Sequence, residues 1–166
     1  MSIQVLGVDL IHLRRIERGI ERFGTKWLRT FLTFEELWDC LPLQQRTPYG
    51  LSFPHTSPDL CPQLVEATYH TWPKESLRRV AGKIAVKEAL SKALGTGLCG
   101  LGYQDGIRWQ DIQVLPESIT VRRPCLTLTG KALTAQAQQG ITRWLASITH
   151  DEGLIYAQVI GISHTS

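Results

Sequence analysis

The chain has 166 residues, of which 43% are hydrophobic, and a formal net charge of +3. This length and apolar content predict a single globular domain over residues 1–166. The weak, dispersed charge does not favour nucleic acid, and no apolar run approaches the ~20 residues of a membrane span, so we expect neither partner.

The first residues predict a strand followed by a helix. Residues 3–10 form an apolar run with β-branched members, and Asp9 lies at its end. An acidic residue so early, without a basic segment before it, argues against a signal peptide and favours the cytoplasm. Apolar residues at helical spacing indicate a helix over about 12–23, ended by Gly24. Asp9 is either a cap of that helix or a metal ligand on a pocket rim.

Three arginines share one face of this helix. Arg15, Arg18 and Arg22 follow one another at i, i+3 and i+7, opposite the apolar stripe and interleaved with two glutamates. An ordinary solvated surface is one explanation. The alternative is a docking surface for an acidic helix of a partner, because arginines in register suit such a ligand.

A second helix and a proline-rich segment come next. The run Thr33-Phe-Glu-Glu36 fits a capping box and predicts a helix to about Leu41. Five of the eight prolines then fall within 42–62, so we expect an irregular insertion at about 42–72. We expect it to be dispensable for the fold, either a surface loop or a segment that tunes partner choice. The widely spaced cysteines predict neither a zinc site nor disulfides; they are Cys40, Cys61, Cys99 and Cys125.

The most informative segment is a long helix that should begin at Pro73 and continue through Leu94. Glu88 and Lys92 lie one turn apart on it and share a face, beside the turn Gly95-Thr96-Gly97, where we expect free backbone N–H groups. A carboxylate can hold Mg²⁺, a lysine can hold phosphate, and glycine lets a ligand approach the backbone. The alternative is a surface Glu–Lys ion pair followed by a glycine cap.

The last third of the chain is rich in predicted strands. A short helix is expected at 130–139, and His150 ends the run Ser147-Ile-Thr-His150 at the lip of a final hairpin. A histidine there is either merely exposed or functional. Helices first and strands later predict an α+β fold. The expected strands are at about 107–115, 118–122, 124–129, 142–149 and 154–162.

Three segments, taken in order, resemble the motifs of the 4′-phosphopantetheinyl transferase superfamily. Their order and spacing are similar to the short bacterial type, holo-acyl-carrier-protein synthase. The resemblance covers about 1–40 and 78–162. The segments are Gly7-Val-Asp9-Leu-Ile-His-Leu-Arg-Arg15, Lys87-Glu88-Ala-Leu-Ser-Lys92-Ala-Leu-Gly-Thr-Gly97 and Ser147-Ile-Thr-His150.

The resemblance implies an antiparallel sheet packed against a long helix and a trimer with sites between subunits. It also implies transfer of the phosphopantetheine arm of coenzyme A to a serine of an acyl carrier protein, with Mg²⁺ and release of adenosine 3′,5′-bisphosphate. Asp9 and Glu88 would hold the metal, and Lys92 would offset charge on the β-phosphate. The remaining roles would be coenzyme A binding by Lys83, Lys92, Gly95, Thr96 and His150, and carrier-protein docking by Arg15, Arg18 and Arg22. The base that takes the serine proton stays open between Glu88 and a metal-bound water.

The chain departs from the family pattern in three places. The insertion at 42–72 is longer than usual, Lys83 stands where arginine is common, and Arg123-Pro124 stands where Gly-Lys-Pro is frequent.

A different class of protein, a coenzyme A or carrier-protein binding module without transfer, is the competing hypothesis. The intact set of Asp9, Glu88 and Lys92 counts against it. An RNA-binding module would need a basic stripe with interleaved aromatics, which the sequence lacks. Which carrier protein is served does not follow from the residues.

Overall fold

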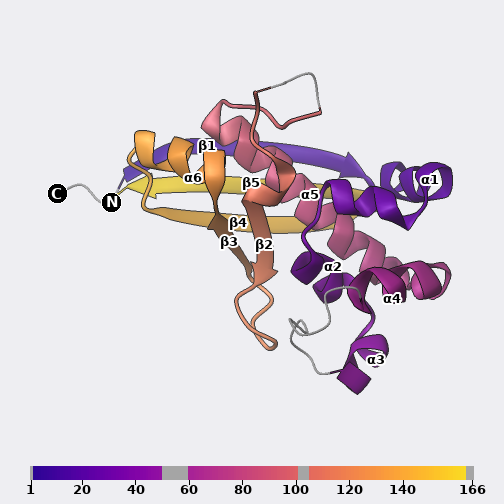
Figure 1. Cartoon of the computed structure of the whole chain (residues 1–166). Coiled ribbons are helices and arrows are strands. Elements are labelled where there is room, and N and C mark those ends of the chain that lie inside the picture. Colours follow the sequence, from indigo (N-terminus) through magenta and orange to yellow (C-terminus); the bar gives the residue numbers. More distant parts are fainter. Residues whose placement is uncertain (1, 50–59, 101–104, 164–166) are drawn as a thin grey trace.

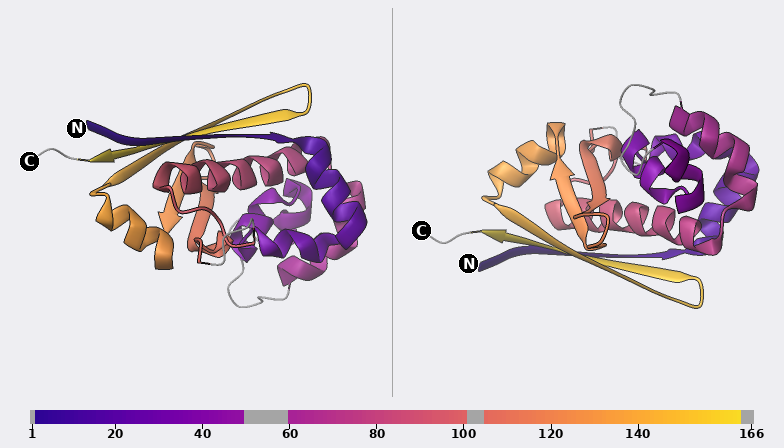
Figure 2. Two further views of the ribbon diagram at one scale, coloured as in Figure 1. Left: turned by 90° about the horizontal axis from the view of Figure 1, so that it is seen from above. Right: turned by 90° about the horizontal axis from the view of Figure 1, so that it is seen from below.

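The computed structural model describes residues 2–49, 60–100 and 105–163. Its main sheet has three antiparallel strands in the order β1-β5-β4. They are β1 (Ser2–His12), β4 (Arg143–Asp151) and β5 (Leu154–Ser163), the last two forming the final hairpin that the sequence predicts. The sheet forms one side of the molecule, with the helices on its other side (Figure 2). This confirms the expected α+β architecture.

The long helix α5 (Lys74–Leu94) runs along the inner face of the sheet (Figure 1). Pro73 is its N-cap, so the helix begins one residue after the start that the sequence predicts, and Gly95 ends it in the left-handed conformation, with φ 70°. The close approach of strand and helix depends on Gly7, since a Cβ there would collide with the carbonyl oxygen of Ala89. This approach brings the end of β1, with Asp9, onto the second half of α5.

The N-terminal helices carry the predicted caps. The helix α1 spans Leu13–Phe23 and ends at Gly24, and a 3₁₀ helix over Thr25–Thr30 follows. The helix α2 (Phe34–Cys40) opens with the complete capping box of Thr33 and Glu36. The cap of α1 is His12, whose Nδ1 accepts a hydrogen bond from Arg14 N. Asp9 is therefore not the cap of this helix, which leaves its carboxylate for another role.

The expected irregular insertion at 42–72 is wrong for the parts that the structure describes; residues 50–59 lie outside them. The flanking parts form α3 (Leu43–Arg46), α4 (Leu60–Thr68) and short 3₁₀ helices at Thr47–Tyr49 and Tyr69–Thr71. Cys61 and Val65 of α4 belong to the hydrophobic core. Proline density hid these helices because Pro42 is the N-cap of α3 and Pro62 lies in the first turn of α4, where proline is tolerated. We therefore no longer expect the segment to be dispensable for the fold.

A second, two-stranded sheet lies beside α5. It consists of β2 (Ile112–Pro116) and β3 (Pro124–Leu128), preceded by a 3₁₀ helix (Trp109–Asp111) and followed by α6 (Gly130–Gln138). The strand expected at 118–122 is wrong, because these residues form the turn between β2 and β3. Ile119 and Val121, which suggested a strand, are surface residues of that turn. No helix within the described ranges is long and apolar enough to cross a membrane.

Candidate active site

Two carboxylates from distant parts of the chain meet between β1 and α5. Asp9 and Glu88 are both buried, with 6% and 9% exposure. Burial raises the pKa of Glu88, and the neighbouring Asp9 carboxylate raises it further, whereas Arg15 and Lys92 oppose the rise. Two like charges brought together out of water cost free energy unless a cation offsets them. The site is therefore built to hold a positive charge.

The polar atoms of this pair fit a divalent cation. Asp9 Oδ2 and Glu88 Oε1 are buried without a hydrogen-bond partner. Among the residues that the structure describes, no group of three or more histidine, cysteine or acidic side chains surrounds them. Two carboxylates without further protein ligands suit Mg²⁺, which usually keeps several waters and binds phosphate oxygens of a substrate.

Two cations that the sequence singled out contact this pair. Lys92 Nζ donates a hydrogen bond to Asp9 Oδ1 at 2.7 Å, while 58% of the lysine side chain stays exposed. Arg15 Nη2 lies 3.4 Å from Glu88 Oε1. The simple i,i+4 ion pair between Glu88 and Lys92 is thus not the arrangement found. Lys92 instead reaches across to the strand, and its exposed ammonium can meet an anion from solvent.

The Gly-Thr-Gly turn differs from the expectation of free N–H groups. Gly95 N donates to Lys92 O, and Thr96 N donates to Ser91 O, both at 3.2 Å, as in an ordinary helix C-terminus. The hydroxyl Oγ1 of Thr96, in contrast, is buried without a partner. The polar group that this turn offers to a ligand is a side chain rather than these two amides.

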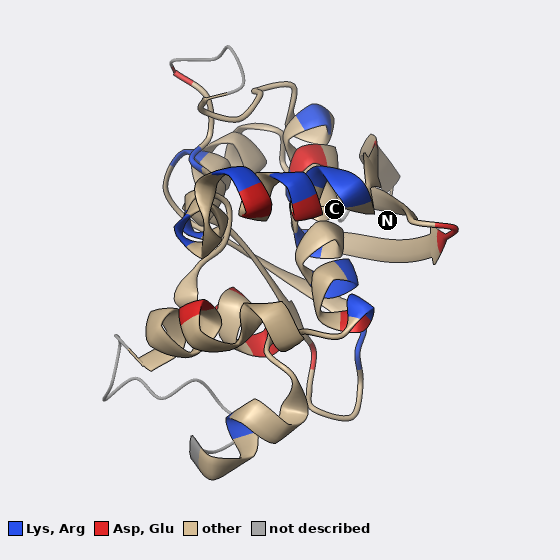
Figure 3. Ribbon diagram, turned by 90° about the vertical axis from the view of Figure 1, so that its right-hand side faces the viewer, with Lys and Arg blue, Asp and Glu red and all other residues tan. Residues whose placement is uncertain are grey.

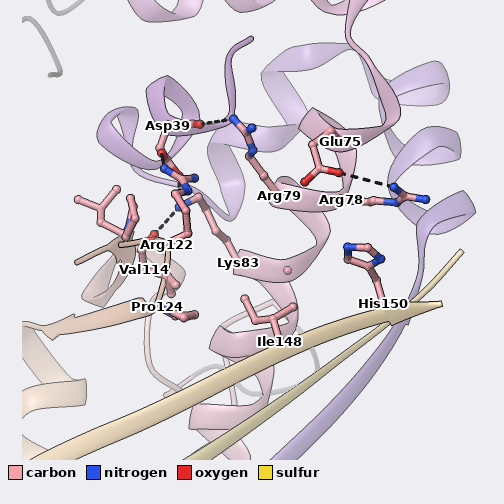
Figure 4. Close-up of a pocket in the computed structure, with 13 residues that line it drawn as sticks. Asp39, Glu75, Arg78, Arg79, Lys83, Val114, Arg122, Pro124, Ile148 and His150 are labelled. Carbon is pink, nitrogen blue, oxygen red and sulfur yellow. Dashed lines mark hydrogen bonds and ion pairs between the residues drawn. The ribbon is translucent and has the colours of Figure 1, made fainter. Parts of the chain in front are cut away.

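A separate pocket of about 380 Å³ lies between the first half of α5, the β2–β3 hairpin and β4 (Figure 4). Lys83 and His150, expected to bind the nucleotide, both line it, whereas Gly95 and Thr96 do not. Lys83 is only 5% exposed, and its Nζ donates to Val114 O at 2.6 Å and lies 3.0 Å from Asp39 Oδ2. His150 rises from β4 toward α5 on the opposite side.

Sequence reasoning missed several charged residues of this pocket. Arg78 and Arg79 come from α5, Arg122 comes from the β2–β3 turn, and Asp39 comes from the end of α2. The two arginine doublets, 78–79 and 122–123, could have been identified from the sequence as candidate anion-binding residues. Asp39 could not, because a lone aspartate in a short helix resembles any surface acid.

The arginine face of α1 lies next to the carboxylate pair. Arg15, Arg18 and Arg22 are exposed, and the ion pair of Arg15 with Glu88 joins this face to the site. Basic and acidic segments alternate along this helix (Figure 3). A molecule seated on α1 would therefore lie beside Asp9, Glu88 and Lys92.

Comparison with known proteins agrees with the family resemblance of the sequence. No protein-family model matches the chain. It is 30% identical over 158 residues to the holo-[acyl-carrier-protein] synthase of Solidesulfovibrio magneticus, covering 95% of this chain and 97% of that protein. It is 31% identical over 154 residues to the synthase of Gloeobacter violaceus, covering 93% and 89%. The crystal structure of the Helicobacter pylori synthase in complex with coenzyme A matches with a TM-score of 0.60 at 25% identity, covering 95% and 99%.

Proposed function

The chain belongs to the holo-[acyl-carrier-protein] synthase family, and we propose that the site between β1 and α5 carries out the transfer. The protein transfers the 4′-phosphopantetheine arm of coenzyme A to a serine hydroxyl of an apo-acyl carrier protein. The observation that supports this assignment is the convergence of Asp9, Glu88 and Lys92, with one buried oxygen on each carboxylate that accepts no hydrogen bond. A module that only bound coenzyme A would have no use for such a pair.

In the reaction, the serine oxygen forms a bond to the β-phosphorus of coenzyme A. The bond from that phosphorus to the bridging oxygen breaks, adenosine 3′,5′-bisphosphate leaves with the electron pair, and the serine proton is released. Negative charge on the phosphate oxygens is offset by the exposed ammonium of Lys92, which Asp9 orients at 2.7 Å. Positioning and electrostatics are the main devices in phosphoryl transfer, so a rigid helix and strand suit this role.

Mg²⁺ is the metal that we propose for Asp9 and Glu88. When bound, it supplies positive charge to the transferring phosphoryl group and a template for its oxygens. The chain's own part is to hold both carboxylates in place. Arg15 and Lys92 favour the charged form of Glu88, opposing the effects of burial and Asp9 on its pKa.

The pocket of Figure 4 is the proposed site of the nucleotide part of coenzyme A. His150 is free to contact a base or ribose from β4, while Lys83 acts through its charge because its Nζ is already hydrogen-bonded. Thr96 Oγ1, buried and unpaired at the other end of α5, is a further contact for the substrate. The backbone amides of Gly95 and Thr96 are poor candidates for binding coenzyme A, because helix carbonyls already accept their hydrogen bonds.

The carrier protein is proposed to dock on α1 through Arg15, Arg18 and Arg22. Because Arg15 touches Glu88, a docked acidic helix would bring its serine to the site. Carriers of fatty-acid synthesis are the substrates we propose, and the cytoplasmic location expected from the sequence stays a prediction.

We also propose that the chain assembles as a homotrimer through the outer face of the main sheet. That face carries large apolar side chains with high exposure, which is unusual for a monomer. They lie on all three strands: Ile3, Leu6, Val8 and Leu10 on β1, Leu145 on β4, and Leu154 and Tyr156 on β5.

The direct test is incubation with coenzyme A, Mg²⁺ and an apo-acyl carrier protein. We expect a mass gain of roughly 340 Da on the carrier, the size of the arm moved in this phosphoryl-transfer reaction. Asp9→Asn and Glu88→Gln should each lower the rate about 100- to 1,000-fold, because each removes a charge that serves the metal. They should also weaken Mn²⁺ binding, measured by calorimetry on the protein without substrate.

The matched control is Glu66→Gln, which removes an exposed carboxylate on α4. It should leave both the rate and metal binding unchanged. If the wild-type protein binds coenzyme A but produces no mass gain, the binding-module alternative holds instead.

A further inference from the structure

A single carboxylate gathers three cations at the wall of the nucleotide pocket. Asp39 lies at the end of α2, and only 9% of its side chain is exposed. Its two oxygens lie 3.0 Å from Lys83 Nζ, 3.7 Å from Arg46 Nη1, and 3.0 and 3.3 Å from the two Nη atoms of Arg122. Its backbone oxygen accepts a hydrogen bond from Arg79 Nη1 at 3.4 Å. Figure 4 shows Arg79, Lys83 and Arg122 beside Asp39.

The cations around Asp39 differ in how far their side chains are exposed. Lys83 and Arg46 are almost fully covered, with side-chain exposures of 6% and 10%, so they are held inside the wall. Arg122 keeps 46% of its side chain exposed although both Nη atoms face Asp39. A two-point contact holds a planar guanidinium in one orientation. Asp39 therefore holds Lys83 in the wall of the pocket and presents Arg122 at its edge.

The charges around the pocket leave a surplus for an anion. Glu75 is paired with Arg78 at 3.5 Å, and Asp39 is shared among its cations. Arg79 contributes a positive charge without an opposing carboxylate of its own among the described pocket residues, since it donates its hydrogen bond to a backbone oxygen. A doubly charged phosphate group is the ligand chemistry that such a wall suits.

The position of the pocket indicates which phosphate group of coenzyme A it would bind. The pyrophosphate of coenzyme A is assigned to Lys92 and the carboxylate pair in the second half of α5. The pocket is formed by the first half, and Lys83 and Glu88 are separated by about 8 Å along the helix axis. The remaining phosphate of coenzyme A is the one on the 3′-oxygen of its ribose.

We propose that Asp39 is a positioning residue that orients Arg122 toward the ribose 3′-phosphate of coenzyme A, with Arg79 as the second cation of that subsite. This inference rests on the proposed function of the site. Lys83, the cation that the sequence favours, serves as a structural partner of Asp39. Selectivity for coenzyme A over its analogue without the 3′-phosphate thus depends on α2 and on the β2–β3 turn.

The test measures binding of two nucleotides by calorimetry, without metal or carrier protein. Adenosine 3′,5′-bisphosphate carries the 3′-phosphate and adenosine 5′-monophosphate lacks it. Arg122→Gln should weaken the bisphosphate about tenfold, as expected for loss of a charge-assisted hydrogen bond, and the monophosphate less than about twofold. The matched control is Arg123→Gln. It removes the neighbouring arginine of the same turn, whose partner is Glu117 and which does not line this pocket.

The role of Asp39 is tested with Asp39→Asn, alone and together with Arg122→Gln. Positioning predicts weaker bisphosphate binding in the single variant, rescue of part of the loss by Asp39→Glu, and no further loss in the double variant. In steady-state assays the KM for coenzyme A should rise while kcat stays within about twofold. The KM for the analogue without the 3′-phosphate should not change.

Three results would overturn the inference. Tighter bisphosphate binding in Asp39→Asn would mean that Asp39 merely competes with the phosphate. Equal losses for both nucleotides in Arg122→Gln would mean a general structural role. Equal affinity of the wild-type protein for both nucleotides would remove the 3′-phosphate subsite. None of these results affects the transfer assay, so the proposed function fails or holds separately.

Discussion

Two lysines of α5, five residues apart, form ion pairs of the same length with opposite surroundings. Lys87 Nζ lies 2.7 Å from Glu36 Oε2, and neither side chain is exposed. Lys92 Nζ lies 2.7 Å from Asp9 Oδ1, but more than half of the lysine side chain is in solvent. Lys87 also donates to the carbonyl oxygens of Phe31 and Trp109, so its three N–H groups are all used. Lys92 has donors left for a ligand.

The comparison shows that burial and the number of acceptors, rather than pair length, separate an ion pair that is fully used within the fold from one that keeps donors for a ligand. Glu36 also accepts hydrogen bonds from Thr33 N and Val114 N, so this one pair joins α2, α5 and β2. Burial lowers the pKa of Lys87, and Glu36 opposes this effect. A buried pair that is fully hydrogen-bonded fixes how elements pack, whereas a half-exposed pair leaves charge for substrate.

The largest expected effect comes from breaking the buried pair. Lys87→Met should lower the free energy of unfolding by about 3–5 kcal/mol, because it leaves the Glu36 charge buried without its cation. Lys92→Met should change it by less than about 1 kcal/mol, as for an exposed pair. Urea denaturation followed by circular dichroism measures both. Equal losses in the two variants would contradict the distinction.

The reverse order is expected for catalysis. Lys92→Gln should lower kcat about 10- to 100-fold with little change in melting temperature, since each factor of ten corresponds to about 1.4 kcal/mol of barrier. Lys92→Arg should restore part of the rate, because it keeps the charge but changes its shape. Full activity in both variants would make Lys92 an ordinary solvated helix residue.

The exposed arginine face of α1 is a third group of cations, which we propose to bind the carrier protein rather than coenzyme A. Arg18→Glu and Arg22→Glu should each raise the KM for the carrier protein about tenfold and leave the KM for coenzyme A unchanged, with an effect that shrinks as salt rises. Arg15→Glu should also lower kcat, because Arg15 contacts Glu88. Lys131→Glu, which reverses an exposed charge on α6, is the control. A higher KM for coenzyme A in Arg18→Glu or Arg22→Glu would contradict docking.

The smallest effect concerns acid stability. Burial tends to raise the pKa of Asp39, but Lys83, together with hydrogen bonds from Arg122 and Lys83, holds it below its usual value of 3.8. The folded protein therefore binds fewer protons at this site than the unfolded chain. The resulting stability is complete above the unfolded pKa and is lost as pH falls through the folded value. The difference in free energy of unfolding between wild type and Asp39→Asn should thus shrink between about pH 5 and pH 2. A difference that does not change with pH would contradict this.

The sequence by itself was sufficient for most local structure. Apolar spacing and end signals predicted α1 with its Gly24 cap, the capping box of α2, α5 from Pro73 to Leu94, and the final hairpin. These features depend on residues within a few positions of one another, so a linear reading contains the necessary information. The same holds for the choice of Asp9, Glu88 and Lys92 as candidates, which rests on short motifs.

Only the tertiary structure decided which groups meet. Periodicity says which face of a helix a side chain occupies, but not what lies opposite that face. Lys92 therefore proved to pair with Asp9 rather than Glu88, and Lys83 proved to be held by Asp39. Burial of α4 and the surface location of residues 118–122 were hidden for the same reason. Charge partners and burial depend on distances through space, which packing alone determines.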